Sequence, residues 1–207
     1  MGVIGDWLFP ALLDAVMRRG RFAAYRRRAL AGARGVVLEI GVGSGLNLPF
    51  YGADARMVLG LDPSPGLLRR AGRRAGRAAC AVHLVQGSAE ALPLADGGVD
   101  TVVTTWTLCS IPDPLAALRE MRRVLRPGGR LHFVEHGLAP DPGLQKWQRR
   151  LTPCWTRVSG GCHLDRKMDD LIRAAGFQLA ELAGGYMPGP RLATFMYEGR
   201  AHSAETD

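Results

Sequence analysis

The sequence has 207 residues and a formal net charge of +8, with 47% hydrophobic and 22% charged residues. This length and composition fit one domain with a sizeable hydrophobic core and exclude a disordered chain. There is no run of eighteen uncharged apolar residues, and Asp6 and Asp14 interrupt the apolar N-terminal stretch. We therefore expect no transmembrane helix, no signal peptide and a cytoplasmic location.

Residues 1–34 are predicted to form an N-terminal helical segment, separate from a domain over residues 35–207. Apolar residues recur at helical spacing through residues 6–30, where Asp6 can cap the first turn and Gly20 divides the stretch into two helices. Residues 1–35 contain seven Arg and two Asp. A basic amphipathic segment of this kind either folds over the domain as a lid, which we favour, or makes a peripheral contact with an anionic membrane.

From residue 36 onward, short apolar runs alternate with segments of helical periodicity. This alternation predicts a parallel sheet with helices on both faces. The predicted strands are residues 36–40, 56–61, 82–85, 99–105, 131–135, 177–182 and 192–197. The predicted helices are residues 66–79, 114–125 and 164–175, and residues 137–162 are expected to be rich in loops.

A glycine-rich turn follows the first predicted strand, with glycines at Gly41, Gly43 and Gly45. Such a turn lets the backbone bend sharply and lets a ligand approach without obstruction by side chains. Leu46 stands where a dinucleotide-binding turn has its last glycine, and Glu39 precedes the turn. Because this carboxylate would repel a pyrophosphate, the turn favours a cofactor that carries a positive charge.

Asp62 ends the second predicted strand, and this position suggests a contact with a ribose. A carboxylate there can accept hydrogen bonds from both hydroxyl groups of the sugar. The alternative role is to form a turn with Pro63 and Ser64. The position of Asp62 after a strand that follows the glycine-rich turn favours the ribose role.

The arginines of residues 66–79 are five in number and have no acidic or aromatic residue among them. Nucleic acid is therefore not the expected partner, and a solvated helix face explains this segment. The four cysteines, Cys80, Cys109, Cys154 and Cys162, have no spacing typical of metal ligands. We expect free thiols and no metal site.

Taken together, these motifs resemble the class I S-adenosylmethionine (SAM)-dependent methyltransferases. The resemblance covers residues 36–136 and also rests on residues 86–94, 99–103 and 125–129. It implies a Rossmann-like α/β fold in which a seven-stranded, mostly parallel sheet has its last strand antiparallel. It also implies SAM as the cofactor, with S-adenosylhomocysteine as the product. The implied cofactor-binding residues are Glu39, Gly41, Gly43 and Gly45 for the methionine moiety, Asp62 for the ribose, Ser88 and Ala89 for the adenine, and Asn47, Pro63, Thr105 and Trp106 around them.

Within this superfamily, the chain is similar to the alkyl-thiol S-methyltransferases. The similarity rests on residues 107–110, 134–136, 153–155, 161–166 and 175–177. It implies methyl transfer to a small or lipophilic thiol, and our candidate catalytic residues are His136, followed by His163. Those relatives have a hydrophobic N-terminal anchor, whereas residues 6–30 here are amphipathic and interrupted by charges.

Three other functions compete with a thiol methyltransferase. Bacterial phospholipid N-methyltransferases share the glycine-rich turn and the Leu48-Pro49 pair that follows it, so a phospholipid amine at a membrane surface is the first alternative. The second is a non-catalytic module that binds SAM. A nicotinamide-dependent oxidoreductase is the most distant, because Glu39 and Leu46 oppose it.

Overall fold

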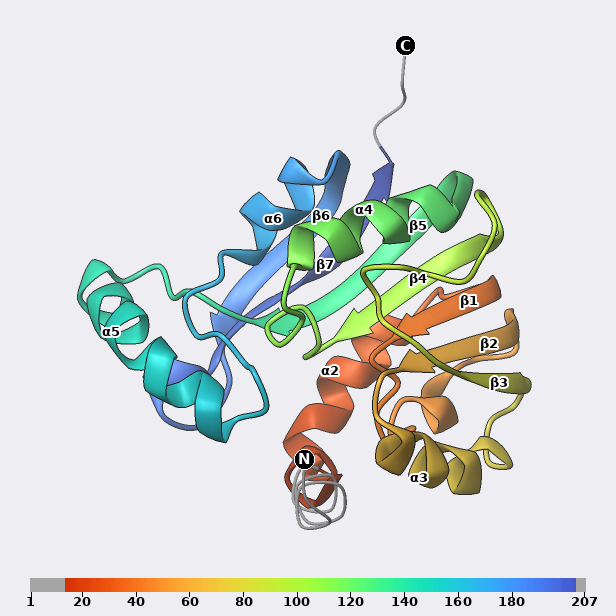
Figure 1. The fold of residues 1–207 in the computed structure, drawn as a ribbon, viewed down its shortest axis with the longest axis horizontal. Coiled ribbons are helices and arrows are strands. Elements are labelled where there is room, and N and C mark those ends of the chain that lie inside the picture. Colours follow the sequence, from red (N-terminus) through yellow and green to blue (C-terminus); the bar gives the residue numbers. More distant parts are fainter. Residues whose placement is uncertain (1–13, 204–207) are drawn as a thin grey trace.

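The computed structural model describes residues 14–203 (Figure 1). Within these residues, seven strands form one sheet. The strands are β1 (Gly35–Ile40), β2 (Ala55–Asp62), β3 (Ala81–Gln86), β4 (Val99–Thr105), β5 (Leu125–His136), β6 (Phe177–Tyr186) and β7 (Phe195–Ser203). Their order is β3-β2-β1-β4-β5-β7-β6, and β7 runs antiparallel to both of its neighbours while the other pairings are parallel. The predicted fold class is confirmed.

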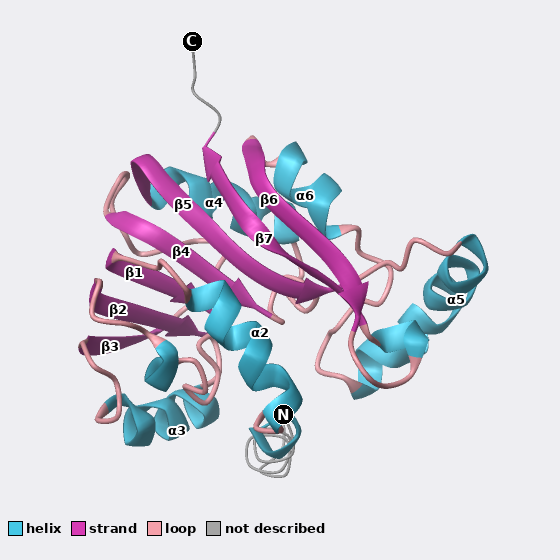
Figure 2. Ribbon diagram, turned by 180° about the vertical axis from the view of Figure 1, so that it is seen from behind, coloured by secondary structure: helices cyan, strands magenta, loops and turns pink. Residues whose placement is uncertain are grey.

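Helices cover both faces of this sheet. They are α2 (Gly20–Leu30), α3 (Pro65–Ala75), α4 (Pro114–Val124), α5 (Pro142–Val158) and α6 (Met168–Ala174), with short 3-10 helices η1 (Leu48–Phe50) and η2 (Arg191–Ala193). α4 and α6 lie on the face that Figure 1 presents, and α2 crosses the opposite face, which Figure 2 presents. Residues 14–17 are also helical.

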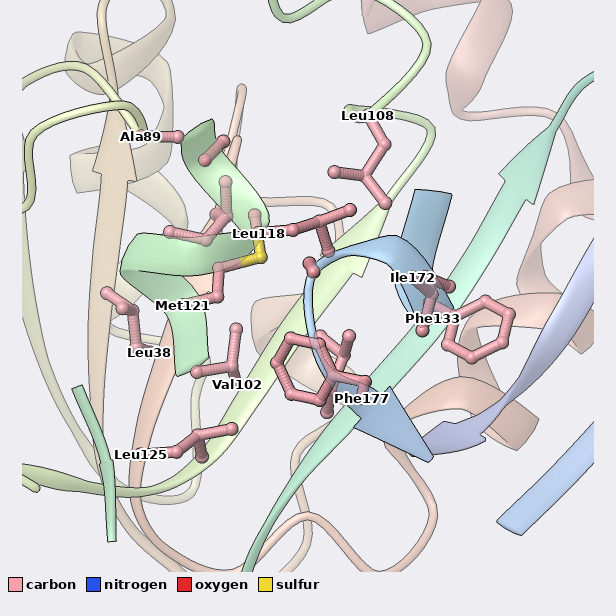
Figure 3. Packing of buried hydrophobic residues seen from close by; sticks show 14 of the residues in the cluster. Leu38, Ala89, Val102, Leu108, Leu118, Met121, Leu125, Phe133, Ile172 and Phe177 are labelled. Atoms are coloured by element: carbon pink, nitrogen blue, oxygen red, sulfur yellow. The ribbon is translucent and has the colours of Figure 1, made fainter. Parts of the chain in front are cut away.

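The central strands are apolar on both faces because both faces are covered. In β1, Leu38 and Ile40 point into the cluster that contains α4 and α6, while Val37 points into the cluster on the other side. This alternation follows from the two-residue period of a strand. Figure 3 shows Leu118 and Met121 of α4 packed over Leu38 and Val102.

The glycine-rich turn and the other candidate residues lie at the carboxyl ends of the parallel strands. Parallel strands bring these ends to one edge of the sheet, which is where open α/β folds bind ligands. β1 ends at Ile40, β2 at Asp62, β4 at Thr105 and β5 at His136. The sheet therefore gathers residues that are far apart in the sequence.

One predicted segment is wrong. The loop-rich region expected over residues 137–162 contains the 17-residue helix α5. Asp141 caps its N-terminus by accepting hydrogen bonds from the backbone of Gly143 and Leu144, and Pro142 occupies the first turn, where proline is tolerated. The Asp141-Pro142 pair predicts the start of a helix, whereas Pro153 inside the helix and the Gly-Gly pair after it predict loops.

The remaining differences are in element boundaries. The Arg126–Gly129 segment does end α4, but β5 is assigned from Leu125, earlier than expected. The helix predicted over residues 164–175 is limited to α6, and the last strand begins at Phe195 because η2 precedes it. Gly176, predicted to close that helix, has a φ of 85° directly after it.

The N-terminal segment packs on the sheet in the part that the structure describes. Phe22, Ala29 and Leu30 of α2 are buried, and Asp14 accepts hydrogen bonds from Ser44 and, at 2.7 Å, from Arg74. Burial alone would raise the pKa of Asp14, but the bonds from Arg74, Ser44 and Arg18 lower it to about 2. Asp14 thereby ties this segment to the glycine-rich turn and to α3.

The Asp6 cap and the apolar positions before residue 14 lie outside the described residues, and the division at residue 34 stays a prediction. Between residues 14 and 203, the structure contains no helix that is both long and apolar enough to cross a bilayer.

Candidate functional site

A pocket of about 740 Å³ opens at the carboxyl edge of the sheet. This volume lies within the range typical of small-molecule sites. The pocket is lined by the ends of β1, β2, β4 and β5, by α2 and residues 14–17, and by the last turn of α5 and the loop that follows it. All predicted cofactor residues except Gly45 contribute to the lining, as does His136.

The three glycines of the turn have different roles. Gly41 and Gly43 have φ values of 67° and 56°, a region in which side chains are rarely tolerated. A Cβ at Gly41 would overlap Thr107, whereas one at Gly43 would meet little protein, so Gly43 faces open pocket space. Gly45 faces away from the pocket toward α3, where a Cβ would lie 3.0 Å from the Cα of Ala71.

Glu39 is buried, and its carboxyl group lies at the base of the glycine-rich turn. Its oxygens accept hydrogen bonds from Asn47 Nδ2 at 2.9 Å and from the Tyr51 hydroxyl at 2.7 Å. Burial raises the pKa of Glu39 to about 7, although these two bonds and the charge of Arg26 oppose the shift. Glu39 therefore changes its charge near neutral pH.

Asp62 contacts the turn directly. It accepts hydrogen bonds from the backbone N–H of Gly43 at 2.9 Å and from that of Ser64 at 2.8 Å. Burial raises the pKa of Asp62, and the two backbone bonds oppose this effect. Each carboxylate oxygen has a second lone pair, so Asp62 can both fix the turn and accept hydrogen bonds from a ligand. Its turn-forming and ribose roles are compatible.

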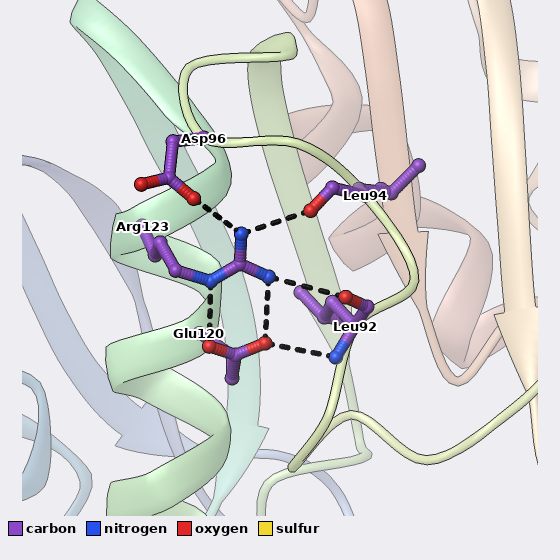
Figure 4. Close-up of polar contacts among 5 residues, drawn as sticks. All are labelled: Leu92, Leu94, Asp96, Glu120 and Arg123. Atoms are coloured by element: carbon purple, nitrogen blue, oxygen red, sulfur yellow. Dashed lines mark hydrogen bonds and ion pairs between the residues drawn. The ribbon is translucent and has the colours of Figure 1, made fainter.

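The loop that carries Ser88 and Ala89 is clamped to α4. Arg123 donates hydrogen bonds to the carbonyl oxygens of Leu92 and Leu94 and forms ion pairs with Asp96 and Glu120 (Figure 4). Glu120 in turn accepts a hydrogen bond from the Leu92 backbone at 2.9 Å. The Ser88 hydroxyl donates to Glu90 at 2.9 Å.

The sequence did not indicate the contact between Trp106 and Arg26. Trp106 has a φ of 51°, and among the described residues it is the only one other than glycine with a positive φ. The Arg26 guanidinium lies 4.9 Å from the centre of its ring, within range of a cation–π interaction. Arg26 is buried, and its Nε has no hydrogen-bond partner among the described residues. Burial lowers the pKa of Arg26 to about 10, so it remains charged at neutral pH.

Two cysteines and a histidine of the pocket lining lie close together. Nε2 of His136 lies 2.7 Å from Sγ of Cys162. Cys109 joins this pair, and the three ligand atoms lie within 4.8 Å of one another. A hydrogen bond with Cys109 and burial raise the pKa of Cys162, so this thiol is protonated at neutral pH.

The loops that bear these groups are held by charged side chains. Glu135 is buried and accepts hydrogen bonds from the Thr107 backbone and the Thr104 hydroxyl, so it fixes the loop after β4. His163 does not line the pocket: its backbone N–H donates to the Cys109 carbonyl at 2.8 Å, and its ring lies against the same oxygen.

Comparison with known proteins agrees with this geometry. A family model for a methyltransferase domain matches residues 38–133. Human thiol S-methyltransferase TMT1B is 38% identical over 170 residues, which cover 79% of this chain and 68% of that protein. The rat protein is 36% identical over 151 residues, covering 70% of this chain, and this chain spans only 61% of the rat protein's length. A phosphatidylethanolamine N-methyltransferase from Cereibacter sphaeroides is 38% identical over 148 residues, 63% of this chain and 72% of that one.

Solved structures share the fold. A SAM-dependent methyltransferase from Methanosarcina mazei superposes with a TM-score of 0.66 at 20% identity, covering 86% of this chain and 96% of that one. The sheet order, the lining of the pocket, the family model and the relatives agree with one another. The chain belongs to the methyltransferase family of these relatives, and its fold is that of a solved SAM-dependent methyltransferase.

Proposed function

We propose that this methyltransferase transfers the methyl group of SAM to a small or lipophilic thiol. Bound SAM supplies an electrophilic methyl group on a positively charged sulfur. The protein has to bind the cofactor, orient the acceptor and exclude water. The observation that carries the proposal is the one pocket that joins the Glu39–Asp62 carboxylates to the Cys109–His136–Cys162 group.

The residues at the cofactor end have the chemistry that SAM requires. Glu39 would accept from the ammonium group of the methionine moiety, and Asp62 from the ribose hydroxyls. Ser88 and Ala89 would border the adenine. Oδ1 of Asn47 is buried without a partner among the described residues, which leaves an acceptor for the ligand. Pro63, Thr105 and Trp106 complete the wall.

Arg26 would bind the carboxylate of the methionine moiety. It is a buried cation whose Nε is unpaired within residues 14–203, and it lines the same pocket as Glu39. A buried charge is stable only when it is paired, so an anionic group of the ligand would satisfy it. Because Arg26 belongs to α2, this contact supports the lid role of the N-terminal segment over the membrane-surface role.

The acceptor end suits a thiol. His136 would orient the acceptor, and Ile111, Trp155, Val158 and Met187 line the pocket with apolar surface. A thiol has an unperturbed pKa of about 8.5 and needs little help to ionise. The 38% identity to human TMT1B supports the same acceptor class.

A phospholipid amine is the alternative acceptor, which the Cereibacter relative supports. Its product is a more highly substituted ammonium, which an aromatic wall would stabilise. Trp155 lines the pocket but is joined at that end by two thiols and an imidazole. We therefore favour the thiol.

Replacing Asp62 tests the cofactor assignment. The Asp62→Ala substitution should weaken SAM binding by about 1–3 kcal/mol, the usual effect of losing hydrogen bonds to a charged group. Isothermal titration calorimetry measures this change. Asp170→Ala, which removes an exposed carboxylate on α6, is the matched control and should leave the affinity unchanged. Equal affinities for the two variants would refute the ribose role.

The raised pKa of Glu39 predicts that SAM affinity depends on pH. Below about pH 7 Glu39 is protonated and cannot pair with an ammonium group. The affinity should therefore rise on the order of tenfold between about pH 5.5 and pH 7.5.

The ligand-free protein should show the opposite trend in stability. Its folded state holds a proton that an unfolded glutamate releases near pH 4.5, so stability should fall as pH rises through about 7. Glu39→Gln should flatten both profiles, and an unchanged SAM profile in that variant would exclude Glu39.

A panel of acceptors tests the reaction. We expect S-adenosylhomocysteine to form with hydrogen sulfide and alkyl thiols, and mass spectrometry to detect methanethiol from the first and a methyl thioether from the second. Alcohols of the same chain length are the matched controls and should be inert, because they do not ionise near neutral pH. Turnover only with phosphatidylethanolamine vesicles would contradict the thiol proposal, as would SAM binding without turnover of any acceptor.

A further inference from the structure

We propose that Cys109, His136 and Cys162 form a three-ligand site for Zn²⁺ or a similar divalent ion at the acceptor end of the pocket. The three residues come from the loop after β4, the end of β5 and the loop after α5. Their ligand atoms lie within 4.8 Å of one another, and all three residues line the pocket.

The donor set matches the chemistry of zinc. Cysteine sulfur and histidine nitrogen are its preferred ligands, with bonds of about 2.3 and 2.0 Å. Around a tetrahedral ion these bond lengths place N and S about 3.5 Å apart. His136 Nε2 and Cys162 Sγ are 2.7 Å apart, so they need to separate by less than about 1 Å.

The two cysteine loops are cross-linked, which holds the ligand set in place. Arg166 donates hydrogen bonds to the carbonyl oxygens of Leu108 and, at 2.7 Å, of Ile111. The bond between the His163 backbone and the Cys109 carbonyl joins the same loops. His163 and Arg166 are therefore positioning residues for this site. Ligand sets fixed by their neighbours in this way bind metals more tightly.

Three protein ligands leave the fourth position of a tetrahedron for a substrate, as in catalytic zinc sites. This step rests on the proposed thiol acceptor. A thiol that binds there releases its proton to solvent, because coordination to zinc ionises it. Its sulfur then forms a bond to the methyl carbon, while the bond between that carbon and the SAM sulfur breaks. The products are a thioether and neutral S-adenosylhomocysteine, and no electron donor or acceptor is required.

Metal binding by the intact chain tests this site directly. We expect one Zn²⁺ per chain in competition with a chromophoric chelator, and X-ray absorption with two sulfur ligands and one nitrogen ligand. Co²⁺ should give a sulfur-to-metal charge-transfer band. Cys109→Ser and Cys162→Ser should each lower Zn²⁺ affinity at least about 10- to 100-fold. Cys154→Ser, at an exposed cysteine outside the pocket, is the matched control.

Each outcome separates this inference from the proposed function. Thiol methylation by metal-free protein, without stoichiometric zinc binding, would overturn the metal site and leave the thiol function intact. Zinc binding without thiol turnover would support the metal site and contradict the thiol function. A Cys109–Cys162 disulfide in the isolated protein, or a zinc spectrum without sulfur, would also overturn the site. Because the Co²⁺ spectrum uses the unmodified chain, the test does not depend on the variants folding.

A second inference rests on α5 alone. We infer that this helix presents a surface for an anionic phospholipid bilayer. Large apolar side chains lie exposed at helical spacing along one side: Trp147 is 55% exposed, Leu151 38%, Trp155 38% and Val158 73%. Gln148 and Thr152 are its buried residues. Figures 1 and 2 both show α5 standing away from the sheet.

The charges of α5 complement an anionic lipid. The helix contains Lys146, Arg149, Arg150 and Arg157 and no acidic residue. Arg150 lies 5.8 Å from the ring centre of Trp147. An apolar stripe with a tryptophan–leucine character and basic neighbours is typical of helices that lie in the membrane interface. Trp155 and Val158 also line the pocket, so a lipophilic acceptor could enter from the bilayer.

Vesicle sedimentation of the full chain tests this surface. We expect binding to phosphatidylglycerol vesicles to exceed binding to phosphatidylcholine vesicles. The double substitution Trp147→Ala and Leu151→Ala should lower partitioning on the order of tenfold or more. Leu182→Ala, at a 43% exposed leucine on β6, is the control. Unchanged partitioning of the double variant would overturn the proposal. A dimer in phosphate buffer that the double substitution abolishes would also overturn the proposal, because the stripe would then bind a second copy of the chain.

Discussion

Two buried carboxylates at the ends of neighbouring strands are the constraint on which the site depends. A buried charge is costly unless hydrogen bonds compensate it. Asp62 is compensated by backbone N–H groups of the glycine-rich turn and of Ser64, so its position fixes the shape of the turn. Glu39 is compensated by Asn47 and Tyr51. Without a ligand this compensation is incomplete, as the raised pKa values of both acids indicate. In the proposed function, the ammonium group and the ribose hydroxyls of SAM would supply the remaining partners of these two acids.

The rest of the molecule positions loops around this pair of strands. Arg123 holds the loop that carries Ser88 and Ala89 against α4, Glu135 holds the loop after β4, and Arg166 joins that loop to the one after α5. In each case one charged side chain makes several hydrogen bonds at once. Such loops carry function because a rigid sheet determines where they begin.

The sequence predicted the sheet and most of the strand-end residues that line the pocket, because both depend on local signals. The apolar runs of the strands, the glycine spacing and the acid that ends the second strand can each be recognised from a few neighbouring residues. The acceptor end was only partly predictable. His136 could be placed at the strand edge, but Cys109 and Cys162 are brought together by loops, so their spacing in the sequence carried no signal. The burial of Arg26 could not be predicted from the sequence, because only the packing of α2 decides which of several neighbouring arginines is buried. The expectation of loops over residues 137–162 failed because proline and glycine outweighed the apolar period of α5.

A crystal structure of the complex with S-adenosylhomocysteine is the most direct test of this account. We expect the ribose hydroxyls to lie on Asp62, the amino group near Glu39, and the thioether sulfur to face Cys109, His136 and Cys162. A nucleoside bound outside the pocket, or a sulfur directed away from those three residues, would contradict the account.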